Sequence, residues 1–216
     1  MNQDWNIPGQ TREPLDPARL GKITASGIAA ILGTPRSKGD TFTEAAITYL
    51  TQKIAERMTG VPEFPLDVAA TRWGLDHEAE GLASLGIDDL DTVQQFIPWG
   101  DHCGCTPDGR FNSVTSGKPW GVEIKCPFNS SVFVKMTMIK DQGQLREAFP
   151  KYYWQVMAGL LFTGWEGWVF AAYDPRFPEG KRTHAIQVIP DQEAFDLIRF
   201  KITLSTKYIT DYGQAL

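Results

Sequence analysis

Apolar residues recur at helical spacing in several segments of the chain. The clearest segment is 43–58, where apolar side chains return every three or four residues before Gly60 and Pro62. This periodicity predicts an amphipathic helix, and the glycine and proline predict its end. The same reasoning predicts helices at about 71–85 and 152–162 and a long one at about 192–212.

A shorter helix is predicted within residues 19–37. Thr24 and Ser26 lie near its start, where hydroxyl side chains favour helix N-caps. Gly33 and Pro35 predict its end. The segment therefore places polar groups at a helix N-terminus.

Runs rich in β-branched and aromatic residues follow the first three helices. They predict strands at 92–99, 103–106, 120–125, 168–174 and 184–189. Pro107 and Gly109 predict a turn after the second of these runs. The order is helices, a sheet built mainly from hairpins, a helix, two strands and a final helix, which indicates the α+β fold class.

The chain of 216 residues predicts a single domain, with residues 1–18 as a proline-containing N-terminal arm. Hydrophobic residues make up 42% of the sequence, which is enough for a folded core. The net charge of −5 argues against a protein that coats nucleic acid by bulk attraction. Any contact with DNA must therefore be local.

Three cysteines, Cys103, Cys105 and Cys126, bear on the location of the protein. Their odd number and the lack of a recognisable signal segment favour a reducing cytoplasm, and the apolar runs are too short to span a bilayer. Three thiols at this spacing are too few for an iron–sulfur cluster and do not match a zinc site. We therefore expect core cysteines.

Asp108, Glu123 and Lys125 form the candidate chemistry. Glu123 and Lys125 share one face of a strand, because side chains alternate along it. A hairpin around the 115–119 loop would bring Asp108 close to Glu123, and paired carboxylates suit a hard cation such as Mg²⁺ or Mn²⁺. An exposed Lys125 would then stabilise charge on a phosphate under attack, which predicts phosphodiester hydrolysis.

The spacing alone leaves a second interpretation open. Glu123 and Lys125 would then form an exposed strand face, and Asp108 would be an ordinary turn residue. A pattern of this kind is degenerate, so it does not decide between the two interpretations.

Several motifs in order resemble the bacteriophage lambda exonuclease family, the YqaJ-like viral recombinases with a PD-(D/E)XK nuclease core. The resemblance implies a restriction-endonuclease-like fold with a central mixed β-sheet flanked by α-helices. The motifs cover most of the chain: RLGKITAS, PRS, WG followed by Glu78, TPDG, EIKCPF, YYWQVMAGLLFTG and FAAYDPR.

The resemblance implies a site with two Mg²⁺ ions, for which Mn²⁺ would substitute. Asp108, Glu123 and the backbone carbonyl of Ile124 match the metal ligands, and Lys125 matches the catalytic lysine. Glu78 matches an acid that supports the second ion or its waters.

Gln155 matches a glutamine that positions the attacking water. Read from the sequence alone, Glu78 could equally be a solvated acid beside Asp76 and Glu80, and Gln155 could make an ordinary buried hydrogen bond.

A pocket for the terminal 5′-phosphate is also implied, with Arg19, Thr24, Ser26 and Thr106 as its matching residues. An arginine fork and hydroxyls near a helix start favour an anion. Ser131 stands where the family has an arginine of this pocket.

Lys135 could substitute for that arginine from the next turn. Arg36 matches an arginine that touches the duplex. Thr71 is polar, close to where the family has an apolar residue that parts the strands.

The resemblance implies a processive, Mg²⁺-dependent 5′-to-3′ exonuclease on double-stranded DNA, which releases mononucleotides and leaves a 3′ overhang for recombination. It also implies a ring-shaped homotrimer in the cytoplasm of a bacterial host and a single-strand annealing protein of the same phage or prophage as partner. The alternatives are a structure-specific or restriction-type endonuclease on the same core and a non-catalytic DNA-binding module.

Overall fold

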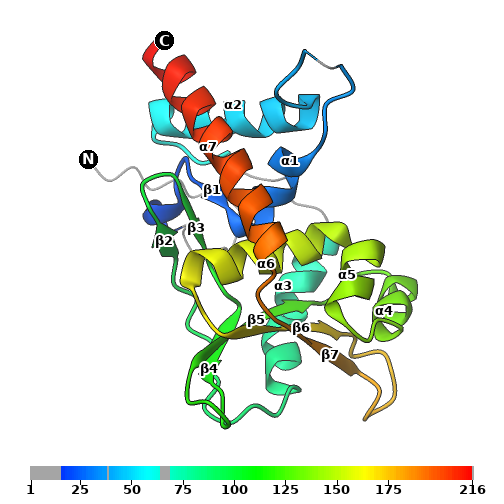
Figure 1. The fold of residues 1–216 in the computed structure, drawn as a ribbon. Helices are drawn as coiled ribbons and strands as arrows, with labels where there is room; N and C mark the ends of the chain where they lie inside the picture. The colour runs from blue at the N-terminus through cyan, green and yellow to red at the C-terminus, as the bar shows by residue number, and fades with distance from the viewer. Residues whose placement is uncertain (1–15, 38, 64–68, 216) are drawn as a thin grey trace.

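The computed structural model describes residues 16–37, 39–63 and 69–215 (Figure 1). Residues 1–15, most of the predicted arm, lie outside this part, and Pro17–Arg19 form a 3₁₀ helix. The helices are α1 (Ile28–Leu32), α2 (Glu44–Thr59), α3 (Ala69–Ala83), α4 (Ser130–Thr137), α5 (Gln142–Ala148), α6 (Pro150–Thr163) and α7 (Gln192–Ala215). The strands are β1 (Ile23–Thr24), β2 (Ile97–Trp99), β3 (Cys103–Cys105), β4 (Gly109–Asn112), β5 (Pro119–Lys125), β6 (Gly167–Tyr173) and β7 (Thr183–Val188).

The strands form two sheets, and both mix parallel and antiparallel pairs. The larger sheet has the order β4-β5-β6-β7, in which only the β5–β6 pair is parallel. The smaller sheet has the order β1-β3-β2, with β1 parallel to β3. The α+β fold with a mixed sheet flanked by helices is therefore confirmed.

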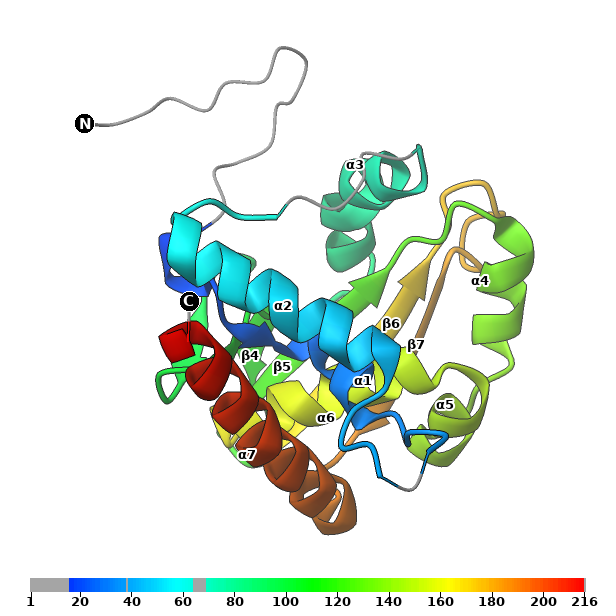
Figure 2. The ribbon, with the colours of Figure 1, turned by 90° about the horizontal axis from the view of Figure 1, so that it is seen from above.

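Helices cover both faces of the larger sheet. Val122 and Ile124 of β5 pack in one apolar cluster with Leu82 of α3. Trp168 and Phe170 of β6 point to the other face and join the main core with α6. Figures 1 and 2 show α2 and α7 as an outer layer over α1 and α6. Because strand side chains alternate, Glu123 and Lys125 lie on the α6 side.

Two glycines make room for the Trp168 indole on that side. A Cβ atom at Gly121 would lie 2.5 Å from the indole, and one at Gly159 of α6 would lie 2.7 Å from it. Any side chain at either position would therefore displace the ring. This close packing holds α6 against β5 and β6.

Three predictions about individual elements were wrong. The predicted strand 92–99 is shortened to Ile97–Trp99, because residues 92–95 are exposed and pair with no strand. The sequence analysis missed α4 and α5, which are too short for their periodicity to stand out.

The third error concerns the first helix. Thr24 and Ser26 make no N-cap bond, and a 3₁₀ turn, Ala25–Gly27, precedes the five residues of α1. Their hydroxyls bond each other instead, at 3.1 Å. No helix in the described part is both long and apolar enough to cross a membrane.

A buried carboxylate fixes the segment that follows β5. Asp174, at the end of β6, has no exposed surface and accepts hydrogen bonds from Arg176 and from the Ser130 hydroxyl. Arg176 also donates to the carbonyls of Pro127 and Phe128. The guanidinium carbon lies 4.4 Å from the centre of the Trp73 ring of α3. One ion pair therefore joins β6, α3 and the start of α4.

We predict that Arg176→Met lowers the free energy of unfolding by about 2–3 kcal/mol, measured by urea denaturation. The loss is smaller than for a fully buried pair because the Arg176 side chain is 40% exposed. Arg182→Met, which removes a guanidinium that donates to the Phe177 carbonyl, is the control and should cost less. Equal effects would contradict the importance of the ion pair.

The same pair sets a pH dependence. Burial would raise the pKa of Asp174, but hydrogen bonds from Arg176 and Ser130 outweigh burial and lower it. The stabilisation is therefore complete above the usual carboxyl pKa of about 3.9 and is lost as the pH falls through the lowered folded value.

Candidate active site

The β4–β5 hairpin brings the predicted carboxylates together. Asp108 precedes β4, and its N–H donates to the Val122 carbonyl at 3.0 Å. Its side chain in turn accepts a hydrogen bond of 2.8 Å from the Ile124 N–H. The predicted pairing of the segments that flank the 115–119 loop is therefore confirmed.

Glu123 is held inside the protein rather than on an exposed face. It is only 3% exposed and accepts hydrogen bonds from Lys125 and from Gln155 of α6, the latter at 2.5 Å. The exposed-face interpretation is therefore wrong for Glu123. The expectation of an exposed Lys125 is also wrong, because only 24% of its side chain is exposed. Its ammonium group pairs with Glu123.

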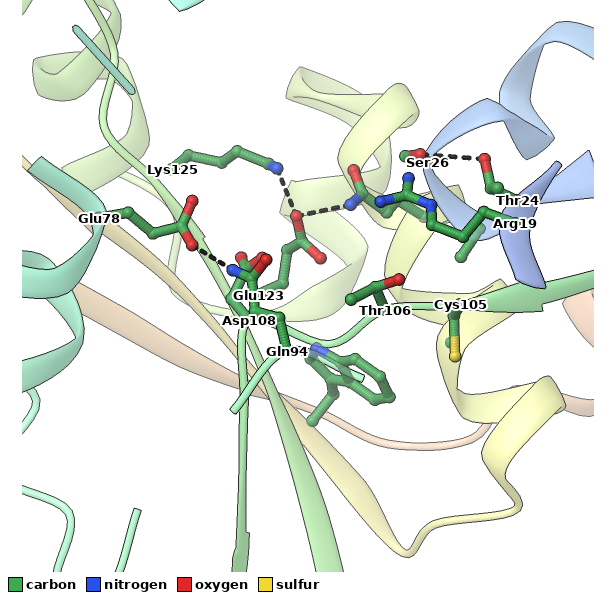
Figure 3. Close-up of a pocket in the computed structure, with 14 residues that line it drawn as sticks. Arg19, Thr24, Ser26, Glu78, Gln94, Cys105, Thr106, Asp108, Glu123 and Lys125 are labelled. Carbon is green, nitrogen blue, oxygen red and sulfur yellow. Dashed lines mark hydrogen bonds and ion pairs between the residues drawn. The ribbon is translucent and has the colours of Figure 1, made fainter. Parts of the chain in front are cut away.

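These groups border a cavity of about 160 Å³ between the larger sheet, α3, α6 and the N-terminal segment (Figure 3). In Figure 3, Glu78 and Lys125 lie on one side, while Arg19, Thr24 and Ser26 lie on the other. The lining of the cavity comprises Arg19, Thr24, Ala25, Ser26, Glu78, Gln94, Cys105, Thr106, Asp108, Glu123, Lys125, Gln155, Gly159 and Trp168.

The cavity unites most, but not all, of the predicted site residues. Glu78 is partly buried, unlike its exposed neighbours Asp76 and Glu80. Arg36 and Ser131 are both exposed and do not line the cavity. Lys135, Thr71 and Ile124 are also absent from its lining.

Two of the lining residues that were not predicted for the site, Gln94 and Trp168, carry N–H donors. The Gln94 amide donates to the Glu78 carboxylate, but Gln94 stands in an irregular segment whose sequence carries no signal for this role. Trp168 was predicted only as a strand residue. Its indole N–H and the Thr106 hydroxyl are buried at the cavity without a hydrogen-bond partner in the described protein. Buried donors of this kind are normally satisfied by water or a ligand.

The carboxylates strongly influence one another. Burial and the charge of Glu123 raise the pKa of Asp108 well above its usual value. Burial is also the main cause that raises the pKa of Glu78. Burial alone would lower the pKa of Lys125. The charges of Glu123 and Asp108 outweigh this effect and raise the pKa, so the lysine stays protonated. Acidic groups are thus crowded in a place with little water to screen them, and the raised pKa values mean that their charged forms are disfavoured unless a cation binds.

The donor atoms of the cavity suit a hard divalent cation. Carboxylate oxygens are the ligands that Mg²⁺ and Mn²⁺ prefer, and a cation would relieve the repulsion between Asp108 and Glu123. Among the described residues, no group of three or more His, Cys, Asp or Glu side chains could hold a metal by itself. A cation here would therefore need further oxygen ligands, such as a backbone carbonyl or water.

The fold is shared with known exonucleases. The mixed sheet with flanking helices is also the fold of a solved alkaline exonuclease and of a solved phage related exonuclease. The sequence model of the YqaJ-like viral recombinase domain matches residues 16–166, and the chain belongs to this family. The resemblance noted in the sequence is therefore confirmed. No curated protein matches the chain.

Solved structures of similar fold are known. An alkaline exonuclease from Laribacter hongkongensis, LHK-Exo, is 22% identical, with a TM-score of 0.74 over 92% of each chain. Its complex with dAMP gives a TM-score of 0.75 at 22% identity, over 92% of this chain and 93% of that one. A phage related exonuclease from Haemophilus somnus 129PT is 15% identical, with a TM-score of 0.69 over 88% and 94% of the two chains.

We predict that the three free thiols are unreactive in the folded protein. Burial is the main cause that raises the pKa of Cys103, Cys105 and Cys126, each to about 12. Very little thiolate therefore exists at pH 8. A colorimetric disulfide reagent should titrate none of the three thiols rapidly in the native protein and all of them in urea. Rapid reaction in the native state would contradict their place in the core.

Proposed function

We propose that the protein is an exonuclease that degrades one strand of duplex DNA from its 5′ end, releases mononucleotides and leaves a 3′ single-stranded overhang. The observation that carries this proposal is the composition of one cavity. Carboxylates and a protonated lysine line one side of it, and an arginine with two hydroxyls lines the other. Such a cavity suits a phosphodiester and, next to it, a terminal phosphate.

The relatives support the same chemistry. Two of the proteins of similar structure are described as exonucleases, and one of them, LHK-Exo, was also solved in complex with dAMP, a mononucleotide. Membership of a viral recombinase family supports a role in DNA recombination.

Mg²⁺, or Mn²⁺ in its place, is the proposed cofactor, with two ions in each site. Asp108, Glu123 and the Ile124 carbonyl would hold one ion, and Glu78 would support the second ion or its waters. When bound, the ions would make water more acidic and neutralise phosphate charge.

The other residues of the cavity position the reactants. Lys125 stays protonated, so its ammonium group would stabilise the negative charge that builds on the phosphate oxygens. Gln155 already donates one hydrogen bond to Glu123 and would orient the attacking water with its carbonyl oxygen.

The opposite side would bind the 5′-phosphate left by the preceding cut. Arg19 offers a planar fork of donors, and Thr24, Ser26 and Thr106 offer hydroxyls. Each cleavage creates a new 5′-phosphate, so this subsite would set the register by one nucleotide per cycle. The exposed residues Arg36 and Ser131 would meet the DNA outside the cavity.

Processive action by a single acidic nuclease domain requires a way to keep the DNA bound. We propose a ring-shaped homotrimer that encloses the duplex, because enclosure replaces bulk attraction in a chain of net charge −5. The 3′ overhang would pass to a single-strand annealing protein of the same phage or prophage, in the cytoplasm of the bacterial host.

Digestion of end-labelled linear duplexes tests the activity and its polarity. With Mg²⁺, a duplex with a 5′-phosphate should release labelled mononucleotides faster than one with a 5′-hydroxyl, and chelator should stop the reaction. A sealed circle should remain intact. Internal cutting of the circle would point to an endonuclease, and DNA binding without cleavage would point to a non-catalytic module.

Lys125→Ala should lower the cleavage rate by about 10²–10³-fold, because it removes the charge that faces the phosphate. Binding of DNA ends should persist. Some loss of stability is expected as well, because Glu123 loses its cationic partner inside the protein. The rate is therefore measured on protein shown to be folded by circular dichroism.

Lys118→Ala is the matched control, since Lys118 is exposed and its contact with Glu166 lies away from the cavity. A folded Lys125→Ala protein that cleaves at the rate of this control would overturn the catalytic role of Lys125.

A further inference from the structure

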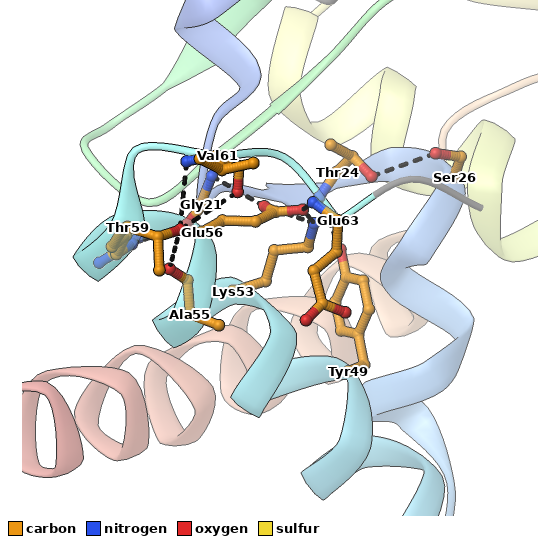
Figure 4. Close-up of polar contacts among 11 residues, drawn as sticks. Gly21, Thr24, Ser26, Tyr49, Lys53, Ala55, Glu56, Thr59, Val61 and Glu63 are labelled. Atoms are coloured by element: carbon orange, nitrogen blue, oxygen red, sulfur yellow. Dashed lines mark hydrogen bonds and ion pairs between the residues drawn. The ribbon is translucent and has the colours of Figure 1, made fainter. Parts of the chain in front are cut away.

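Another buried acid, Glu56 of α2, lies outside the cavity lining (Figure 4). Only 3% of the residue is exposed. Its carboxylate accepts hydrogen bonds from the Gly21 N–H at 2.9 Å and from the Glu63 N–H at 3.2 Å. The Lys53 ammonium group donates to both oxygens, at 2.9 and 2.8 Å. Glu56 therefore joins the end of α2 both to the chain just beyond the helix, at Glu63, and to the distant N-terminal segment, at Gly21.

The contact with Gly21 fixes an unusual piece of backbone. Gly21 has a φ of +64°, a backbone conformation that residues other than glycine rarely adopt. The next residue of α2, Arg57, donates from Nε to the Gly21 carbonyl at 2.7 Å. Consecutive residues of α2 therefore hold both the N–H and the carbonyl of Gly21.

A third contact from α2 holds the same segment further along. The Tyr49 hydroxyl accepts the Thr24 N–H at 3.0 Å, and the Thr24 hydroxyl bonds that of Ser26. Figure 4 shows Tyr49, Lys53 and Glu56 along α2 facing this segment. Glu56 thus holds Gly21, which lies in the sequence between residues of the cavity lining: Arg19 precedes it, and Thr24 and Ser26 follow it.

We propose that Glu56 is a positioning residue for the phosphate side of the cavity. Through Gly21 it sets the path of the chain between Arg19 and Thr24, and so fixes the fork of Arg19 relative to the hydroxyls of Thr24 and Ser26. Glu56 thereby determines how strongly the protein prefers a 5′-phosphate to a 5′-hydroxyl. This inference rests on the proposed function, because it assigns a determinant of specificity to the same site.

The bonding pattern at Glu56 requires a carboxylate. Oε2 accepts from Gly21 and Oε1 from Glu63, so both oxygens must act as acceptors. A glutamine offers one acceptor oxygen, and its NH₂ group can only donate. In Glu56→Gln, either Gly21 or Glu63 therefore loses its partner, although the side chain keeps its size.

The test compares full-length wild-type and Glu56→Gln protein on duplexes with 5′-phosphate and 5′-hydroxyl ends, at saturating Mg²⁺. Cleavage of the phosphorylated end should fall about tenfold, since a displaced binding group weakens positioning of the substrate. Cleavage of the hydroxyl end should change by less than about twofold, because the carboxylates and Lys125 are untouched. The ratio of the two rates is the readout.

Glu44→Gln is the matched control, since Glu44 is an exposed acid in the first turn of the same helix. It should leave the ratio unchanged. Tyr49→Phe is a second variant that keeps the bulk of the ring and removes the acceptor of the Thr24 N–H. It should lower the ratio in the same direction, which tests the inference even if Glu56→Gln does not fold.

The outcomes are distinguishable. Equal losses on both ends would show a structural role alone and would overturn the inference, as would an unchanged ratio in both variants. A wild-type protein that cleaves DNA without preferring the phosphate would overturn the phosphate subsite and this inference together, but not the nuclease activity. A protein that cleaves neither end would overturn the proposed function itself.

Discussion

A carboxylate removed from water must be met by cations or N–H groups, and this requirement shapes how the described segments are joined. Glu56, Glu123 and Asp174 are all buried, and each is bonded to groups that lie in other elements or loops. Glu56 joins α2 to the N-terminal segment, and Asp174 joins β6 to the start of α4. Glu123 joins β5 to α6.

The three acids differ in how completely cations and N–H donors compensate their negative charge. Asp174 meets the guanidinium of Arg176 in a two-point contact, and Glu56 meets Lys53 and two N–H groups. Glu123 instead shares one lysine with Asp108, whose pKa rises because of burial and of Glu123 itself. Of these three buried acids, Glu123 alone belongs to a group in which carboxylates outnumber cations, and that group lines the cavity. The fold thus separates acids that hold the protein together from acids that can bind something else.

The sequence predicted the structure correctly where neighbouring residues decide it. The period of segment 43–58 and the alternation of Glu123 and Lys125 predict a helix and a shared face that the structure contains. The predictions failed where contacts between distant segments decide the structure. Gln94 reaches Glu78 only because the chain folds back, and segment 92–95 is not a strand because no neighbouring strand pairs with it. Burial of Lys125 likewise depends on elements far along the chain.

The charges of the cavity lining also constrain how DNA could enter. Among the described residues that line it, Glu78, Asp108 and Glu123 are acidic, whereas Arg19 and Lys125 are basic. Lys125 is already paired with Glu123, so Arg19 is the basic group not engaged with these carboxylates. A phosphodiester beside the carboxylates would meet repulsion unless a cation intervenes, whereas a terminal phosphate beside Arg19 would not. In the proposed function, recognition of the end and cleavage of the bond would therefore have different electrostatic requirements, and chelation of divalent ions should separate them.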